Sequence, residues 1–236
     1  MAWLETASET FVARHDERDA AEAERVLAQL EYARPRLQKL LNTDAGELAV
    51  VIHPSTAQLD AAAPWLVAQR ALTAPAGRRY LAGWAGENEL HVLSPRLLAQ
   101  RASNVEGSLE MLMLTPSALL AKRLLGVGGR TALKRFGGGA WRVEGAAQFF
   151  SGQTKHVRPA VVARLREGPT PSFPPDRRDA TLLGGTVFEL LAREEGEARC
   201  VALARDGELE HAFRGRPMRQ SEQAWRSHLS RLGGGR

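Results

Sequence analysis

The sequence predicts an α+β domain, with a small mixed sheet and helices in the N-terminal half and a mainly helical C-terminal half. Segments with the length and pattern of β-strands occur only within the first hundred or so residues, whereas apolar residues spaced by three and four dominate the rest. We expect one domain over residues 1–236, with a strand-containing half (1–105), a helical half (106–232) and a frayed tail (233–236).

The first half begins with an alternating segment at 6–14, which predicts one short strand. Apolar residues then recur at three and four over 17–41, which is typical of a long amphipathic helix. Pro35 is expected to bend or split that helix. The continuous apolar run at 47–53 predicts a central strand.

Capping and turn residues divide the next segment of the chain. Ser55 is a predicted N-cap for a short helix, and 64–77 is expected to be a loop with at most one helical turn. The segments 78–84 and 88–93 are expected to form a hairpin, and Ser94 to begin another short helix.

Helical patterns follow one another after residue 105. The most apolar one begins at Ser108, contains Pro116 and ends at the glycines of 126–129. A second begins directly after the glycines 137–139. The remaining predicted helices are 159–166, 179–195, 197–205, 206–213 and 221–232.

Composition excludes several classes of protein. With 44% hydrophobic and 25% charged residues among 236, the chain can bury a substantial core. The single cysteine, Cys200, excludes an intramolecular disulfide and a cysteine-based structural zinc site, and we expect it to be a buried small apolar residue. No run approaches the roughly 20 apolar residues of a membrane span, and no signal peptide begins the chain, so we expect a cytoplasmic protein without a membrane span.

The net charge of +5, from 32 Lys and Arg against 27 Asp and Glu, comes mostly from scattered arginine. Basic residues are densest between 122 and 178, and we expect them to be solvated helix faces, with no nucleic-acid partner. The alternative is a loosely bound anionic partner. They include Lys122, Arg123, Arg130, Lys134, Arg135, Arg142, Lys155 and Arg158.

The main candidate residue is Glu144, in the predicted helix over 140–153. It lies among apolar residues, and Gly145 beside it leaves room for close approach, so its carboxylate should face a neighbouring helix or a cleft. As a structural group it would pair with basic residues near Arg142 or accept from backbone amides.

This helix has the form Trp-x-x-Glu-Gly-x-Ala-x-Phe, and two later segments extend the pattern. Residues 189–196 end in a Glu-Gly pair, and an Ala-Phe pair in 209–213 precedes a Trp-Arg pair in 223–229. In this order the motifs resemble those of the peptidase-MA-like, or gluzincin-like, zinc metallopeptidases. The resemblance spans most of the chain. The residues that carry it are Trp141, Glu144, Gly145, Ala147 and Phe149.

The resemblance implies a zinc site built on an H-E-x-x-H helix, whose two histidines bind the metal together with a later glutamate. Glu144 stands at the position of that later glutamate. The histidines are missing, because no two of the six in the chain are three or four residues apart. Depending on the register, the ligand positions are held by Leu109 and Met113 or by Thr115 and Leu119.

We therefore expect no zinc and no other cofactor, although zinc is expected in the family. The remaining alternative for a metal is a distant histidine, His91 or His156, brought in by the fold. Each also has a simpler interpretation, His91 as one face of a strand and His156 as an exposed residue.

The predicted function is a peptide- or protein-binding pseudoenzyme with a vestigial cleft. Trp141, Glu144, Gln148 and Gln153 are its expected lining, and an edge strand at 89–93 would accept a peptide as a further strand. One alternative is an active hydrolase that uses an unrecognised metal set, or the pair Glu110 and Glu144 if about 5–10 Å separates the carboxyls. The other is a structural domain that depends on a partner. The sequence does not set the oligomeric state.

Overall fold

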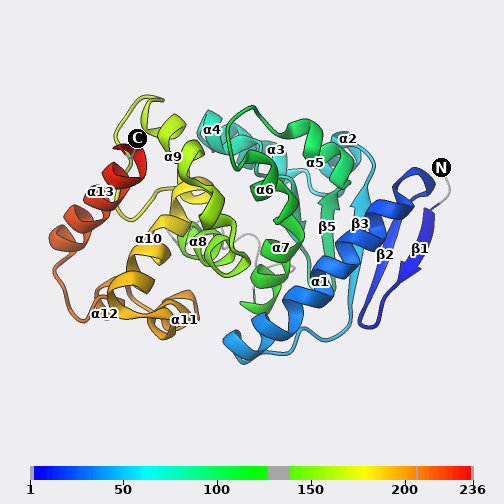
Figure 1. The fold of residues 1–236 in the computed structure, drawn as a ribbon, viewed down its shortest axis with the longest axis horizontal. Coiled ribbons are helices and arrows are strands. Elements are labelled where there is room, and N and C mark those ends of the chain that lie inside the picture. The colour runs from blue at the N-terminus through cyan, green and yellow to red at the C-terminus, as the bar shows by residue number, and fades with distance from the viewer. Residues whose placement is uncertain (1–2, 127–138, 206, 235–236) are drawn as a thin grey trace.

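The computed structural model describes residues 3–126, 139–205 and 207–234. It has the predicted α+β class, with a five-stranded mixed sheet followed by a helical half (Figure 1). Every strand of the described chain lies before residue 94. None of the helices in these ranges combines the length and apolarity needed to cross a membrane.

The sheet has a parallel centre and two antiparallel edges. Its order is β1-β2-β3-β5-β4; β2, β3 and β5 are parallel, and β1 and β4 pair antiparallel with β2 and β5. The strands are β1 (Trp3–Ala7), β2 (Phe11–Asp16), β3 (Leu48–His53), β4 (Gly83–Ala85) and β5 (Glu89–Leu93).

Three strand predictions are wrong. The strand predicted at 78–84 is the shorter β4 (Gly83–Ala85), because Arg78 is still helical, although the antiparallel hairpin with β5 forms. The segment 6–14 is not one strand but parts of β1 and β2, joined by a turn that the alternation conceals. The turn is held by Glu31 of the following helix, whose carboxylate accepts from Ser8 Oγ, Thr10 N and Thr10 Oγ1 at 2.7–2.8 Å. The strand at 89–93 is not an edge either, because β5 lies between β3 and β4.

The long predicted helix forms after a 3-10 turn, η1 (Glu17–Asp19), as α1 (Ala20–Leu41). It continues through Pro35, so the predicted split does not occur. A proline inside a helix costs about 3 kcal/mol or more. Buried apolar residues on both sides of Pro35, including Leu30 and Leu37, pack into one core and keep the helix continuous.

Short helices connect β3, β4 and β5. Ser55 caps α2 (Thr56–Ala62) as predicted, since its Oγ accepts from Gln58 N at 3.2 Å. The expected loop at 64–77 is instead largely helical, because its two prolines stand at helix starts. Ser94 precedes a helix but does not cap it; its Oγ donates to the buried Asp19. The helices are α3 (Trp65–Leu72), α4 (Pro75–Arg78) and α5 (Pro95–Arg101).

The helical half follows the prediction with small shifts. Pro116 lies in the first turn of a helix, so the predicted apolar helix is divided in two there. The last helix reaches Gly234, so the tail predicted to fray from 233 is still helical at Gly233 and Gly234. The elements are α6 (Ser108–Met113), α7 (Thr115–Leu124), α8 (Ala140–Ser151), η3 (Gln153–His156), α9 (Arg158–Leu165), α10 (Ala180–Glu195), α11 (Glu197–Arg205), α12 (Leu209–Ala212) and α13 (Met218–Gly234).

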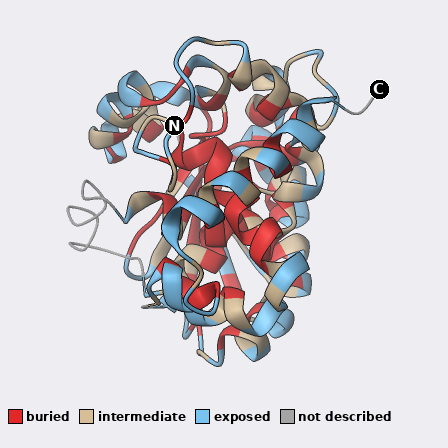
Figure 2. Cartoon of the chain, turned by 90° about the vertical axis from the view of Figure 1, so that its left-hand side faces the viewer, coloured by how far each residue is buried: buried red, intermediate tan, exposed pale blue. Residues whose placement is uncertain are grey.

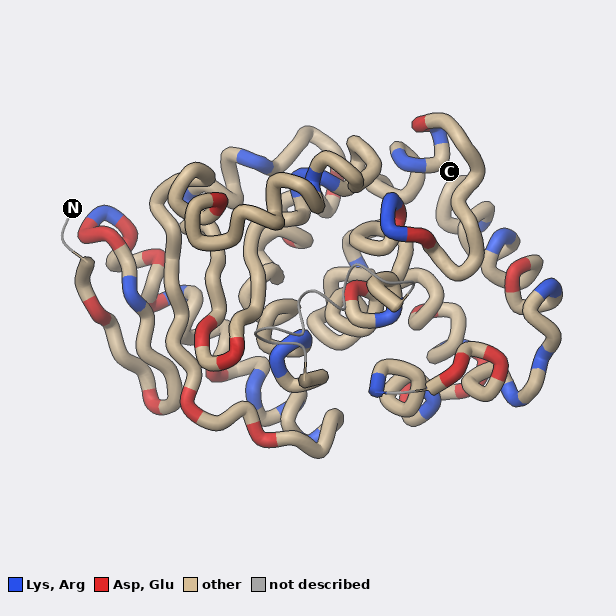
Figure 3. Tube along the Cα trace, turned by 180° about the vertical axis from the view of Figure 1, so that it is seen from behind, with Lys and Arg blue, Asp and Glu red and all other residues tan. Residues whose placement is uncertain are grey.

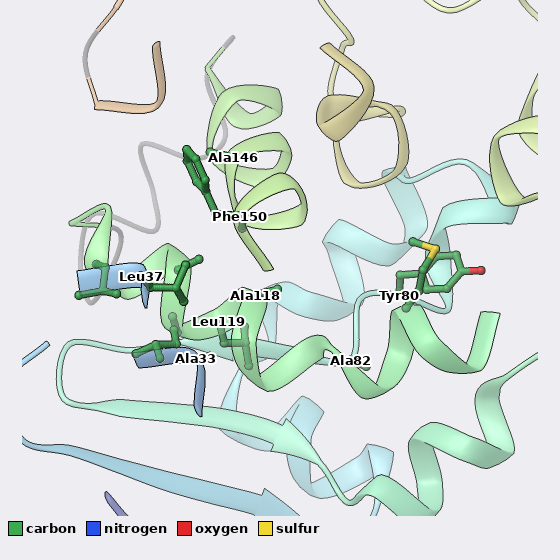
Figure 4. Packing of buried hydrophobic residues seen from close by; sticks show 14 of the residues in the cluster. Ala33, Leu37, Tyr80, Ala82, Ala118, Leu119, Ala146 and Phe150 are labelled. Atoms are coloured by element: carbon green, nitrogen blue, oxygen red, sulfur yellow. The ribbon is translucent and has the colours of Figure 1, made fainter. Parts of the chain in front are cut away.

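α7 connects the two halves of the core. It contacts α1, β4 and β5 on one side and α8 on the other. Figure 4 shows Leu37 of α1, Leu119 of α7 and Phe150 of α8 in this packing, and Figure 2 shows buried positions concentrated between the layers. Cys200 is fully buried as predicted, and burial raises the pKa of its thiol to about 12.

At β1 and β2, the face of the sheet that points away from α1 is open to solvent. Val12 is 39% exposed there, whereas Phe11 and Ala13 on the opposite face are buried against α1. Seen from behind, acidic and basic residues are interspersed along the visible chain (Figure 3). Three of the basic residues in the region 122–178, namely Arg130, Lys134 and Arg135, lie outside the described ranges.

Candidate functional site

Glu144 lies on α8 and faces α7, where it forms a buried ion pair with Lys122. The Lys122 ammonium donates to both carboxylate oxygens at 2.8 Å. The side chains are 12% and 10% exposed, so Glu144 is buried as predicted. Lys122 is not the solvated residue that was expected, since its side chain is only 12% exposed and its ammonium contacts Glu144.

The contact between α8 and α10 sets the position of Glu144. The two helices touch at glycines: a Cβ built on Gly145 would lie 2.4 Å from the carbonyl carbon of Gly184. Side chains larger than hydrogen would push the helices apart. This crossing fixes α8 against α10, while Glu144, one residue earlier, points to α7.

Glu144 and Lys122 line a small, largely enclosed cavity between β4, α7 and α8. Its volume is about 30 Å³, which is room for one or two water molecules. A substrate side chain does not fit. The lining residues are Tyr80, Leu81, Gly83, Thr115, Ala118, Leu119, Lys122, Glu144, Ala147, Gln148, Gln153 and Thr181.

The other predicted cleft residues have structural contacts. Gln148 holds α8 to α10 by donating to Thr181 O and accepting from Gly185 N. Gln153 Nε2 donates to Met111 O at 2.7 Å. Both residues line the cavity, but their side-chain amides already form hydrogen bonds within the protein. Trp141 does not line it; its ring is buried against Phe188.

Glu110, the second candidate carboxylate, is exposed and lies elsewhere. It borders an open surface cavity of about 700 Å³, together with Lys155 and His156. The structure thus places Glu110 and Glu144 in different cavities. This geometry does not favour a reaction in which the two acids act on one substrate.

The donors around Glu144 do not fit a zinc ion. Two registers were considered for the missing histidines. Thr115 and Leu119 of one register line the cavity of Glu144, whereas Leu109 of the other is 43% exposed. Zinc sites use imidazole, thiolate and carboxylate ligands, and an ammonium offers no lone pair. Among the residues that the structure describes, no three His, Cys, Asp or Glu are grouped as metal ligands.

Neither alternative histidine reaches Glu144. His156 lies at the cavity of Glu110. His91, on β5, is part of a hydrogen-bonded chain on the sheet: His53 Nε2 is 3.0 Å from His91 Nδ1, and His91 Nε2 is 3.1 Å from Glu89 Oε2. The ring of Trp84 stacks on His91 at 4.2 Å between centroids.

Burial sets the protonation of this histidine pair. It lowers the pKa of His53 to about 4, with a further lowering from the nearby His91. Burial also lowers the pKa of His91, against the opposing charge and hydrogen bond of Glu89. Both rings are therefore neutral at pH 7. Sequence reasoning missed the pair because 38 residues separate its members and only the strand order makes them neighbours.

Comparison of the chain with protein-family models, curated proteins and solved structures returns no match. The class of protein must therefore be defined by the fold and the site. They define an α+β domain in which a lysine neutralises a buried helix carboxylate beside a sheet edge.

Proposed function

We propose that this protein is a non-catalytic relative of the gluzincin-like metallopeptidases that binds an extended segment of a peptide or partner protein. The ion pair between Lys122 and Glu144 supports the proposal that the protein is non-catalytic. Where the resemblance implies zinc, an ammonium contacts both oxygens of Glu144. It neutralises the carboxylate but cannot ligate a metal or activate water.

The size of the cavity supports the same conclusion. A general base or metal ligand must reach the reacting atoms of a substrate. At Glu144 the volume of about 30 Å³ is too small for a peptide bond with its flanking residues. Glu144 therefore acts as a structural anchor between α7 and α8.

The binding part of the proposal rests on β1, at the far edge of the sheet. In the described chain β1 pairs with β2 alone, and its Trp3 and Leu4 are 48% and 42% exposed on opposite faces. An edge strand with unpaired main-chain groups and exposed apolar side chains is a template for strand addition. β1 thus replaces the predicted docking strand at 89–93.

The ladder defines which groups a bound segment would meet. Ser8 N donates to Phe11 O, and bonded pairs alternate along an antiparallel ladder. The N–H and C=O groups of Glu5 and Ala7 therefore point away from β2. A partner strand would pair with these groups and place its side chains beside Trp3 and Leu4.

Short random peptides displayed on phage test this binding. We expect peptides to be enriched on the wild-type protein and on Glu5→Ala, and to be lost on Glu5→Pro. Proline removes the outward N–H of Glu5 and leaves the bonds to β2 intact. Absence of enrichment, or equal enrichment on Glu5→Pro, would contradict strand addition at β1.

Metal content and hydrolysis test the non-catalytic part. Protein purified without chelator or a metal-affinity tag should carry far less than one zinc per chain and should leave unfolded casein intact with or without added zinc. Stoichiometric zinc, or zinc-dependent cleavage that Glu144→Gln abolishes, would overturn it.

A further inference from the structure

The helices α2 to α5 lie over the ends of β3 and β5 (Figure 1). Three arginines of this region lie close together, since Arg79 and Arg101 exchange hydrogen bonds and the charges of Arg70 and Arg79 both act on Arg101. Arg70 is on α3, Arg79 follows α4 directly, and Arg101 ends α5. Asp60 of α2, paired with Arg70 Nη1, is the one carboxylate that forms a salt bridge with any of them in the described chain. The cluster of Asp60, Arg70, Arg79 and Arg101, which we call the arginine cluster, has a net charge of +2.

Main-chain carbonyls hold the guanidinium groups in place. Arg70 Nε donates to Leu81 O at 3.1 Å. Arg79 Nη1 donates to Arg101 O at 3.1 Å, and Arg101 Nε donates to Arg79 O at 3.2 Å. Arg101 Nη1 also lies 3.5 Å from Thr56 Oγ1, at the exposed side of the cluster. The groups are thus preorganised, and Asp60 compensates only one of their three positive charges.

Two observations show that the positive charge is undercompensated. Arg70 Nη2 is buried and has no hydrogen-bond partner among the described residues. Burial lowers the pKa of Arg101, and the neighbouring charges of Arg70 and Arg79 lower it further, against the opposing effect of Asp60. Like charges held together in this way are stabilised by an anion.

We propose that the arginine cluster binds a phosphate monoester group. A phosphate carries about −1.5 to −2 at pH 7 and three acceptor oxygens, which matches the net charge of +2 and the three clustered guanidinium groups. A carboxylate would compensate only half of the charge. The Thr56 hydroxyl, beside Arg101, is a further donor for a phosphate oxygen. This site uses none of the residues on which the proposed peptide binding depends.

Isothermal titration and thermal unfolding with inorganic phosphate and with phosphoserine, against sodium chloride at equal ionic strength, test the proposal. Both phosphates should bind and raise the melting temperature. Tighter binding of phosphoserine would identify a monoester as the ligand, whereas equal affinity would identify the phosphate group itself. If neither binds better than chloride, the proposal is overturned.

Two variants and a matched control locate the binding. Arg101→Gln should weaken phosphate binding about tenfold or more, because it removes a charge-assisted donor. Asp60→Asn, which raises the net charge to +3, should strengthen it. Arg25→Gln, in an exposed pair with Glu22, should bind as the wild type does. Phosphate binding that Arg101→Gln leaves unchanged, or that Asp60→Asn weakens, contradicts a site at the arginine cluster.

Discussion

The ammonium of Lys122 lies 2.8 Å from each carboxylate oxygen of Glu144, and the two side chains join α7 to α8 in a nearly closed cavity. Burying two charges is costly, and the attraction between them offsets the cost only while both are present. Each charged group is therefore tolerated in the protein interior only while the other is present.

Removing both partners should be less harmful than the two single removals added together. We expect Glu144→Gln and Lys122→Met each to lower the free energy of unfolding by about 3 kcal/mol, since each leaves an uncompensated buried charge. The double variant should lose clearly less than the sum of the two single losses. Urea unfolding of the four proteins measures this coupling, and additive losses would show that the pair is not coupled.

Substitution of Gly145 by alanine should disrupt the crossing of α8 and α10. The added methyl group would meet the backbone of Gly184 at 2.4 Å, and backbone cannot rotate away. We expect a loss of about 1–3 kcal/mol in thermal or urea unfolding. The control is Gly139→Ala, at the start of the same helix, where a Cβ meets nothing within 4 Å. A comparable loss in the control would refute the packing argument.

The histidine pair should make stability depend on pH below neutrality. The pKa of His53 is lowered to about 4 in the folded protein, against an ordinary value of 6.5. The unfolded chain therefore binds the proton first, and stability falls as the pH drops from 6.5 toward 4, by on the order of 3 kcal/mol in all. Above pH 6.5 this contribution is fully present.

His53→Gln separates this effect from the titration of carboxylates. The variant should be less stable than the wild type at pH 7.5, because packing against Trp3 and His91 is lost. At pH 4.5 the difference in unfolding free energy should shrink or reverse, since glutamine does not take up the proton that destabilises the folded wild type. A difference in unfolding free energy that stays constant between the two pH values would exclude His53 as the origin.

Glu31 should control the opening of the β1–β2 hairpin. Its carboxylate accepts three hydrogen bonds from Ser8 and Thr10. Burial raises its pKa, but these hydrogen bonds outweigh burial and leave the pKa lowered overall. In Glu31→Gln we expect faster amide hydrogen exchange in residues 3–12, with β3 and β5 unchanged. Arg25→Gln, on the outer face of α1, is the control, and equal exchange rates in Glu31→Gln and the control would contradict the role of Glu31.

Local patterns were sufficient for much of the fold. The spacing of apolar residues located α1, α8 and α10, and the continuous run of Leu48 to His53 located the central strand. Capping chemistry located the start of α2 at Ser55. These features depend on residues within a few positions of each other. The hairpin turn at 8–10 could not be predicted in this way, because the carboxylate that stabilises it belongs to Glu31, more than twenty residues further along the chain.

The sequence alone determined that Glu144 is buried on an apolar helix and that the chain lacks a pair of histidines at metal-binding spacing. Only the tertiary structure decided that Lys122 neutralises this carboxylate, that Glu110 lies in another cavity, and that β1 and β4 are the sheet edges. The reason is physical: helix periodicity and capping act over one or two turns. Ion pairs and strand order bring together residues whose separation along the chain carries no local signal.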